Sequence, residues 1–240
     1  MASSKTRGIR YSLELVKPKA ALARAGSIAV IAGGETLHVF GVKHPPHVAL
    51  ANLLDDEKAA LKFVESYGPL FASKEYLWKN GQARDLLPLS PNESVHELLK
   101  EHPKADFYHY GISHLHQQRD VLRKAWEGDR AAIESIRQHA SANISSQWKF
   151  NRGRIDITAP DAWTVVCILF LIDHESRNTV KCENPDCPAP YFVRKRRTQK
   201  FCEAGPCVAY GQRLRSNKWW NEHGNEWREQ AQKKSSRRAK

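Results

Sequence analysis

The sequence has no hydrophobic run long enough to cross a membrane. The longest, Ala162 to Ile172, covers 11 residues, whereas a helix needs about 20 to span a bilayer. Near the N-terminus Arg24 interrupts the alanine-rich stretch, so no apolar segment leads to a small-residue cleavage site. The sequence therefore predicts no membrane span, no export and a cytoplasmic location.

Several sequence motifs of enzymes are also missing. There is no phosphate-binding glycine loop, no serine nucleophile elbow and no His-Glu-x-x-His motif. The histidines His109, His114 and His116 lie close in sequence, but on one helix His109 and His116 would be about 10.5 Å apart along its axis, too far to share an ion. Because the chain has 11 histidines, such a cluster is expected by chance. We expect the protein not to be an enzyme.

The chain has fewer acidic than basic residues, and most of the difference lies in residues 181–240. The chain has 38 Lys and Arg against 26 Asp and Glu, a net charge of +12. Residues 181–240 hold 15 basic and 6 acidic residues, which is +9 of that excess. A basic segment indicates a polyanionic partner, and nucleic acid is the first candidate.

Length and composition predict a globular protein of one or two domains. We expect an α+β fold: a mostly helical N-terminal domain with small β-hairpins, then a small treble-Cys-turn zinc-finger domain made of a hairpin and a helix. The predicted segments are a flexible arm (1–25), an α-rich domain (26–176), a four-Cys zinc finger with a basic helix (177–229) and a disordered basic tail (230–240).

Two hairpins are predicted in the α-rich domain. The first joins 27–32 to 36–42 through Gly33-Gly34-Glu35, and the second turns at Asn151-Arg152-Gly153 between alternating apolar residues. Residues 80–92 contain Gly81, Pro88 and Pro91 and are predicted to form a loop.

Helices are predicted from apolar spacing and capping residues. One runs from Asp55-Asp56 to Gly68, and a short one opens with a capping box at Ser94 and Glu97. A longer helix carries the stripe Tyr108, Ile112, Leu115, Leu122 and Trp126, then a further helix follows Asp129 with Ile133, Ile136 and Ala140. Pro160-Asp161 caps the apolar run at 162–172, whose helix is expected to end near Ser176.

Four of the five cysteines form two Cys-x4-Cys pairs, Cys182 with Cys187 and Cys202 with Cys207, separated by 14 residues. Such pairs wrap turns around two edges of a thiolate tetrahedron, and the intervening residues suffice for a hairpin. Four buried thiols or two disulfides are the alternative. Cys167 lies inside the apolar run, where a buried hydrophobe is expected.

A site with four cysteine ligands has no open position for water or substrate. We therefore predict one structural Zn²⁺ per chain rather than a catalytic ion. Basic residues surround the pairs, and phosphate contacts by such side chains supply much of the affinity for DNA. The candidate nucleic-acid contacts are Arg194, Lys195, Arg196, Arg197, Lys200, Arg213, Arg215 and Lys218.

A helix is predicted from Val208 to about Trp227, with Tyr210 and Leu214 packed on the zinc element. Such a helix can enter the DNA major groove. Trp219, Trp220 and Trp227 either stack bases of a single strand or pack on the protein itself.

Residues Lys181 to about Trp220, K-C-E-N-P-D-C-P-A-P-Y-F continued by K-F-C-E-A-G-P-C and a basic helix, resemble the CGNR-type zinc finger of bacterial transcription regulators. Pro185, Phe192, Phe201 and the four cysteines match the family pattern. The signature tetrapeptide is not retained, and Arg213 is the candidate for its arginine. The resemblance implies DNA binding by the finger and an N-terminal domain that senses a ligand or stress.

The prediction is thus a zinc-dependent DNA-binding protein, a transcription regulator that contacts duplex DNA. Binding of RNA or single strands, or a zinc-stabilised protein-interaction module, are the alternatives. A small-molecule effector on the N-terminal domain and a homodimer are left open.

Overall fold

The computed structural model describes residues 10–16, 18, 20–24, 27–31, 36–38, 45–70, 77–79, 82–83, 107–144, 148–151, 154–159 and 161–238. The chain divides into two compact units, residues 1–179 and 180–240. This boundary lies close to the one that the sequence predicts, at residues 176 and 177.

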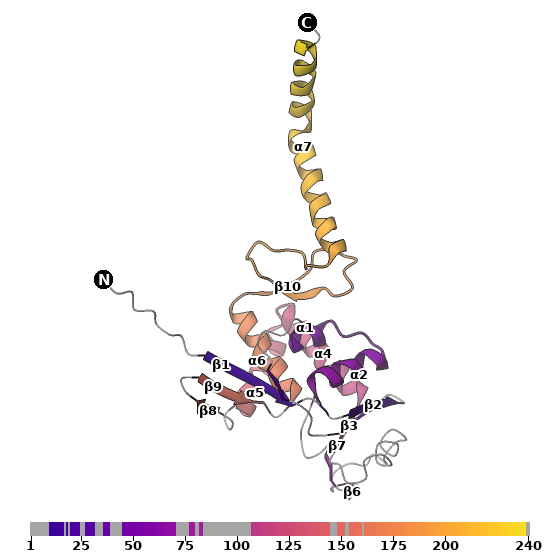
Figure 1. The fold of residues 1–240 in the computed structure, drawn as a ribbon, viewed down its shortest axis with the longest axis vertical. Helices are drawn as coiled ribbons and strands as arrows, with labels where there is room; N and C mark the ends of the chain where they lie inside the picture. The colour runs from indigo at the N-terminus through magenta and orange to yellow at the C-terminus, as the bar shows by residue number, and fades with distance from the viewer. Residues whose placement is uncertain are drawn as a thin grey trace, which may run out of the picture. The chain divides into compact units, whose positions relative to one another are not determined.

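The strands of the first unit form two sheets (Figure 1). A five-stranded sheet has the order β2-β3-β7-β5-β6, with strands Ala20–Arg24, Ser27–Ile31, Phe107–Gly111, Leu77–Lys79 and Gln82–Ala83. A four-stranded sheet has the order β4-β1-β9-β8, with strands Thr36–His38, Arg10–Val16, Arg154–Thr158 and Trp148–Asn151. Strands β1 and β9 pair in parallel.

Five described helices accompany these sheets. They are α1 (Pro46–Ala51), α2 (Glu57–Tyr67), α4 (Ile112–Trp126), α5 (Arg130–Ile144) and α6 (Ala162–Glu175). Strand β1 lies beside α6, whereas β2 lies beside α2 (Figure 1). The described part of the chain is mostly helical, as the sequence predicts.

Helix α6 forms the centre of the core. All residues from Ala162 to Phe170 are buried, because the helix is apolar on every side. Phe170 contacts Trp126 of α4 with ring centroids 5.6 Å apart, and Trp126 stacks on His47 of α1 at 5.7 Å. His47 Nε2 lies 3.0 Å from Asp173 Oδ2 of α6, so a polar pair joins α1 to α6 inside this apolar surrounding.

The predicted helices agree with the structure where local signals set their ends. Asp56 and Asp161 each accept a hydrogen bond from a backbone N–H three residues on, at 2.7 Å, which begins α2 and α6. Gly68 and Gly128 have φ of 88° and 93°, in the left-handed region that favours glycine after a helix. Cys167 is buried without a disulfide, as predicted.

The start of the predicted long helix is wrong. Residues 107–111 form strand β7, and α4 begins at Ile112. Phe107, Tyr108 and Tyr110 are aromatic residues, which are enriched in strands. Tyr108 therefore pairs with Val30 and Leu77 in the five-stranded sheet instead of continuing the stripe of Ile112, Leu115, Leu122 and Trp126.

Strand pairing departs from the sequence predictions at the N-terminus. Residues 10–16 and 20–24, assigned to a flexible arm, form β1 and β2. β3 and β4 do not form a hairpin: β3 pairs with β2 and β7, and β4 pairs with β1. The register Arg24↔Ser27 leaves only Ala25 and Gly26 between β2 and β3, the shortest common hairpin connection.

The second predicted hairpin is confirmed. Strands β8 and β9 pair antiparallel, with Asn151 opposite Arg154. Gln82 and Ala83, inside the predicted loop 80–92, form the short strand β6. The Gly33-Gly34-Glu35 turn and the capping box at Ser94 and Glu97 lie outside the described residues.

A two-stranded antiparallel hairpin of β10 (Thr179–Lys181) and β11 (Tyr191–Val193) starts at the last residue of the first unit and otherwise belongs to the second, in which helix α7 (Gly205–Arg238) follows it. α7 is 34 residues long and continues through residues 230–238, which were predicted as a disordered tail. Ala, Gln, Lys and Arg in that stretch are good helix formers, which offsets its lack of apolar residues. No helix among the described residues is long and apolar enough to span a membrane.

Candidate metal centre

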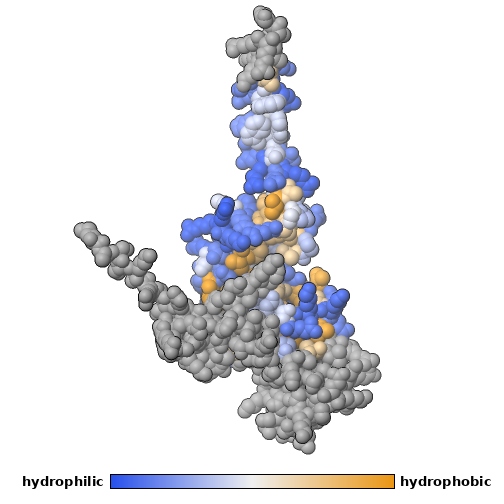
Figure 2. All heavy atoms as spheres, in the orientation of Figure 1, coloured by the Kyte–Doolittle hydropathy of each residue, from blue (hydrophilic) through white to orange (hydrophobic). Residues whose placement is uncertain are grey.

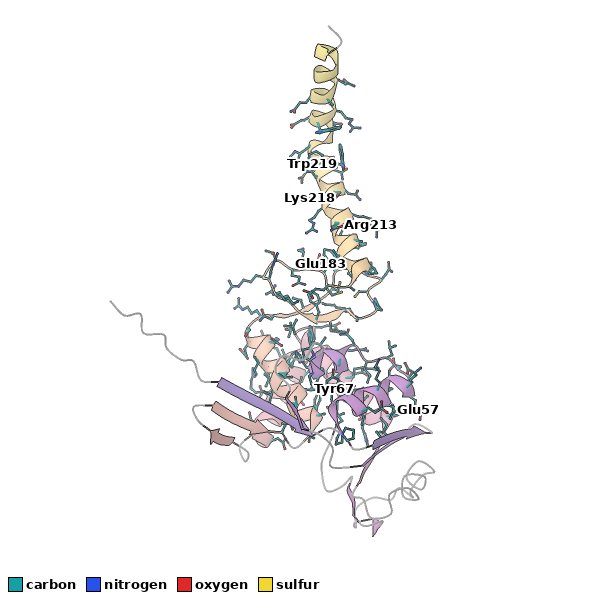
Figure 3. All side chains as sticks on the ribbon, viewed as in Figure 1. Glu57, Tyr67, Glu183, Arg213, Lys218 and Trp219 are labelled. Atoms are coloured by element: carbon teal, nitrogen blue, oxygen red, sulfur yellow. The ribbon has the colours of Figure 1, made fainter. Side chains whose placement is uncertain are left out.

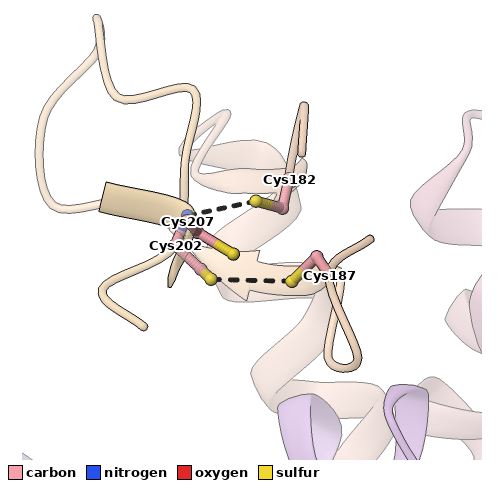
Figure 4. A group of neighbouring side chains, drawn as sticks. All are labelled: Cys182, Cys187, Cys202 and Cys207. Carbon is pink, nitrogen blue, oxygen red and sulfur yellow. Dashed lines mark hydrogen bonds between the residues drawn. The ribbon is translucent and has the colours of Figure 1, made fainter. Parts of the chain in front are cut away.

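The four cysteines of the two Cys-x4-Cys pairs converge in the second unit. Cys182 follows β10 and Cys187 ends the turn after it, whereas Cys202 precedes α7 and Cys207 lies in the first turn of α7. Their Sγ atoms all lie within 4.8 Å of one another. Figure 4 shows the four side chains converging on one point between the hairpin loop and the helix.

The sulfur positions fit tetrahedral metal coordination. A tetrahedron with metal–sulfur bonds of about 2.3 Å has sulfur–sulfur edges of about 3.8 Å. Cys187 Sγ and Cys202 Sγ lie 3.7 Å apart. All five cysteines are free thiols rather than disulfides, so the four of the cluster can together hold a metal ion.

The hairpin differs in position from the predicted one. The sequence predicts a hairpin between the two pairs, but β10 and β11 flank the first pair, so Cys182 and Cys187 lie in the hairpin loop. Two backbone hydrogen bonds hold the elements together: Cys182 N donates to Pro190 O at 2.7 Å and Glu183 N donates to Lys200 O at 3.0 Å. The second bond ties the loop of the first pair to the segment before Cys202.

Polar contacts to the sulfur atoms come from the turn residues. The side-chain amide of Asn184 donates to Cys207 Sγ at 3.2 Å, and Cys202 N approaches Cys182 Sγ at 3.5 Å. Asn184 Oδ1 accepts from Asp186 N, which fixes the amide within the turn. Asn184 was not among the site residues predicted from the sequence, although it lies inside the first Cys-x4-Cys loop.

The thiols differ in their tendency to ionise. Burial raises the pKa of Cys187 and of Cys202 above the usual thiol range. The hydrogen bond from Asn184 instead lowers the pKa of Cys207. Without a metal ion the buried cluster thus opposes the simultaneous ionisation of its thiols, and a bound cation would compensate for their charge.

A small apolar core packs against the sulfur cluster. Phe192 is buried beside the cysteines, and Val180 and Phe201 pack on the same group. A Cβ added at Gly211 of α7 would lie 2.7 Å from the Phe201 ring, so the helix can approach Phe201 this closely only with glycine there. This contact holds the first two turns of α7 against the segment that precedes Cys202.

The candidate nucleic-acid contacts differ in the partners that they have within the second unit. Three lysines pair with glutamates, two arginines make other contacts, and three arginines have no carboxylate partner among the described residues. Lys195 Nζ lies 2.8 Å from Glu203 Oε1, Lys200 Nζ lies 2.9 Å from Glu183 Oε1, and Lys218 Nζ lies 3.8 Å from Glu222 Oε1. Arg194 donates to Arg197 O, and the Arg213 guanidinium lies over the Tyr210 ring. Within the described chain no carboxylate pairs with the remaining exposed candidates, Arg196, Arg197 and Arg215.

The predicted packing of α7 holds in part. Tyr210 is half-buried and contacts Phe201 edge-on, whereas Leu214 is 45% exposed. Trp219, Trp220 and Trp227 are also exposed (Figure 3 labels Trp219), so among the described residues they do not form a core.

Among the described residues, the histidines do not form a metal site. His109 lies in β7 rather than on a helix with His116, and His116 Nδ1 lies 3.8 Å from Asp55 Oδ1. Across the described residues, the four cysteines are the only group of three or more His, Cys, Asp or Glu side chains placed to share an ion.

Comparison with known proteins gives no match. No family model, no curated protein and no solved structure matches this chain. Any functional assignment therefore depends on the residues of the site itself.

Proposed function

We propose that the second unit is a zinc finger that binds DNA, and that the protein acts in the cytoplasm as a transcription regulator. The observation that carries the proposal is the convergence of four cysteine sulfurs at the base of a basic helix. We also propose that residues 181–220 are similar to CGNR-type zinc fingers, which agrees with a DNA-binding role.

Zinc is the metal that this donor set favours. Four thiolates at tetrahedral spacing match structural Zn²⁺ sites, in which every coordination position is occupied by protein. Cys182, Cys187, Cys202 and Cys207 would hold the ion, and the ion would fix the hairpin loop to the first turn of α7. We therefore assign the metal a structural role, with no chemistry of its own.

DNA is the partner that the charge distribution favours. The exposed guanidinium groups of Arg196, Arg197 and Arg215 are not neutralised by described carboxylates, and such groups bind phosphates. The three lysines that pair with glutamates exchange one partner for another on binding, so they contribute less. The first unit is proposed to receive a signal, with a small-molecule effector and a homodimer as parts of that proposal.

A cysteine substitution tests this function in the full-length chain. Cys202→Ser removes one ligand, and we expect loss of bound zinc and a loss of duplex DNA affinity of more than tenfold, because the start of α7 is no longer held. Zinc content and fluorescence anisotropy with a labelled duplex measure both effects.

Cys167→Ala serves as the matched control, because it removes a cysteine from α6 and leaves the four-Cys cluster intact. Unchanged DNA binding by a zinc-free Cys202→Ser protein would reject the proposal.

A further inference from the structure

Three tryptophans form a continuous exposed surface on α7. Trp219 and Trp220 have ring centroids 4.9 Å apart, and Trp220 and Trp227 have centroids 5.4 Å apart. The three side chains are 43%, 47% and 53% exposed, respectively. We call these three residues the tryptophan surface.

Exposure of this kind sets the three apart from the core tryptophans. Trp126 and Trp163 of the first unit are 7% and 3% exposed. A half-exposed tryptophan leaves much of a large apolar ring in water, and three in contact make a contiguous apolar patch of the kind that marks binding sites. In Figure 2 the described part of α7 beyond its first turns is mostly blue to white, so the surface lies on a hydrophilic helix.

The ring geometry leaves aromatic faces open. Neighbouring rings meet edge to face, with interplanar angles of 85° and 84°. In such an arrangement each contact covers one face of only one of the two rings, so flat faces remain available. A planar partner can stack on them.

A second copy of the chain is a poor occupant for this surface. α7 carries eight Lys and Arg and three Glu, a net charge of +5, so two copies of the helix would repel one another. A stable dimer buries about 800 Å² on each partner, much more than three half-exposed side chains present.

The charge and the rings together fit an unpaired nucleic-acid strand. Between Arg213 and Arg228 the helix holds four basic residues and two glutamates, over about 22 Å at 1.5 Å per residue. Figure 3 labels Arg213, Lys218 and Trp219 in this order along the helix. Aromatic faces that stack bases beside cations that hold phosphates are how proteins bind single strands.

We infer that the tryptophan surface of α7 binds single-stranded DNA by stacking unpaired bases. The inference rests on the proposed DNA-binding function, which supplies DNA as the partner. A duplex buries its base faces within its own stack, so the tryptophan surface adds affinity only where the strands are separated. The protein would then favour DNA in which a duplex adjoins an unpaired segment.

The test compares four labelled probes with the full-length, zinc-loaded protein: a 20-mer DNA duplex, a 20-mer DNA single strand, the duplex with a single-stranded extension, and an RNA 20-mer. The variant Trp220→Leu/Trp227→Leu keeps apolar bulk but removes two rings. We expect it to weaken binding of the single strand and of the extended duplex by at least about tenfold, with duplex binding unchanged.

Two further variants keep the test decisive. Trp220→Phe/Trp227→Phe retains aromatic faces and should restore most of the single-strand affinity. Leu214→Ala removes an exposed apolar side chain from the same helix and should change neither affinity.

Several outcomes would overturn the inference. One is an equal loss of affinity for duplex and single strand in the leucine variant, and another is no loss for either probe. Tenfold tighter binding of the RNA 20-mer would also overturn it. So would a dimer, seen in sedimentation, that the leucine substitutions dissociate. Duplex binding without single-strand binding rejects the inference alone; binding of no probe rejects the proposed function too.

Discussion

At the scale of single residues, Asn184 connects the two cysteine pairs of the cluster. Its amide lies in the loop of the first cysteine pair and donates to Cys207 in the second, although 23 positions separate the two residues. Groups that hydrogen-bond to metal ligands orient them and stabilise their ionised form. The thiolate of Cys207 thus depends on a residue that is not itself a ligand.

Asn184→Ala should lower the zinc affinity of the full-length protein by about 10- to 100-fold. The amide hydrogen bond to Cys207 is lost, so the thiolate that binds the metal is less stabilised. Competition with a chromogenic chelator measures the affinity. Asp186→Ala, an exposed side chain in the same turn, is the control, and equal affinities for the two variants would contradict the role given to Asn184.

Gly211 allows α7 to pack on Phe201. Gly211→Ala should destabilise the second unit by about 1–3 kcal/mol, as overpacking does, because the new Cβ would meet the ring at 2.7 Å. Gly205→Ala at the start of the same helix, where nothing lies within 4 Å of the added Cβ, should leave stability unchanged. Chelator-induced and thermal unfolding followed by circular dichroism distinguish the two; equal behaviour would show that the close contact is unimportant.

Some elements have ends that are determined by residues within one helical turn, whereas others depend on strands far away in the sequence. The ends of α2 and α6 follow from Asp56, Gly68 and Asp161, which act within one helical turn, so the sequence predicts them. The pairing of β1 with β9 joins residues more than 140 positions apart. No pattern in either strand specifies that partner, so this pairing could not be predicted, whereas the short turn between β8 and β9 made their pairing predictable.

Helix α7 shows how composition can mislead. Residues 230–238 lack an apolar face, which favours disorder, yet their helix propensity continues the element.

The cysteine cluster could be predicted because it depends on spacing in the sequence. Four thiols in two short loops have few other arrangements, whereas the ring of Phe201 against Gly211 depends on packing that spacing does not encode.

The packing of α5 on α6 gives the first unit a pH response. His139 of α5 lies beside Trp163 and 3.2 Å from Thr164 Oγ1 of α6, and burial lowers its pKa below the usual 6.5. The unfolded chain therefore binds more protons than the folded chain below about pH 6.5, and stability falls as the pH is lowered.

His139→Gln should flatten this response, because glutamine can still bond Thr164 but does not titrate. Thermal unfolding of the zinc-loaded protein between pH 7 and pH 5 measures it, with the exposed His223→Gln as the control. An equally steep fall in the melting temperature of both variants would assign the response to other groups.

At the scale of the whole molecule, charge and metal ligands belong to one unit. Residues 180–240 contain all four clustered cysteines and +9 of the net +12 charge. The first unit holds the larger apolar core and is nearly neutral by comparison. This division agrees with the proposal that the second unit contacts DNA and that the first has a separate role.

The central claim is that zinc makes the second unit able to bind DNA. The most direct measurement is the affinity of the full-length protein for a labelled mixed-sequence duplex, with and without bound zinc, over a series of salt concentrations. We expect binding only with zinc, with log K falling against log salt by about 0.9 for each phosphate contacted. Zinc uptake without DNA binding, or binding that ignores zinc and salt, would contradict the account.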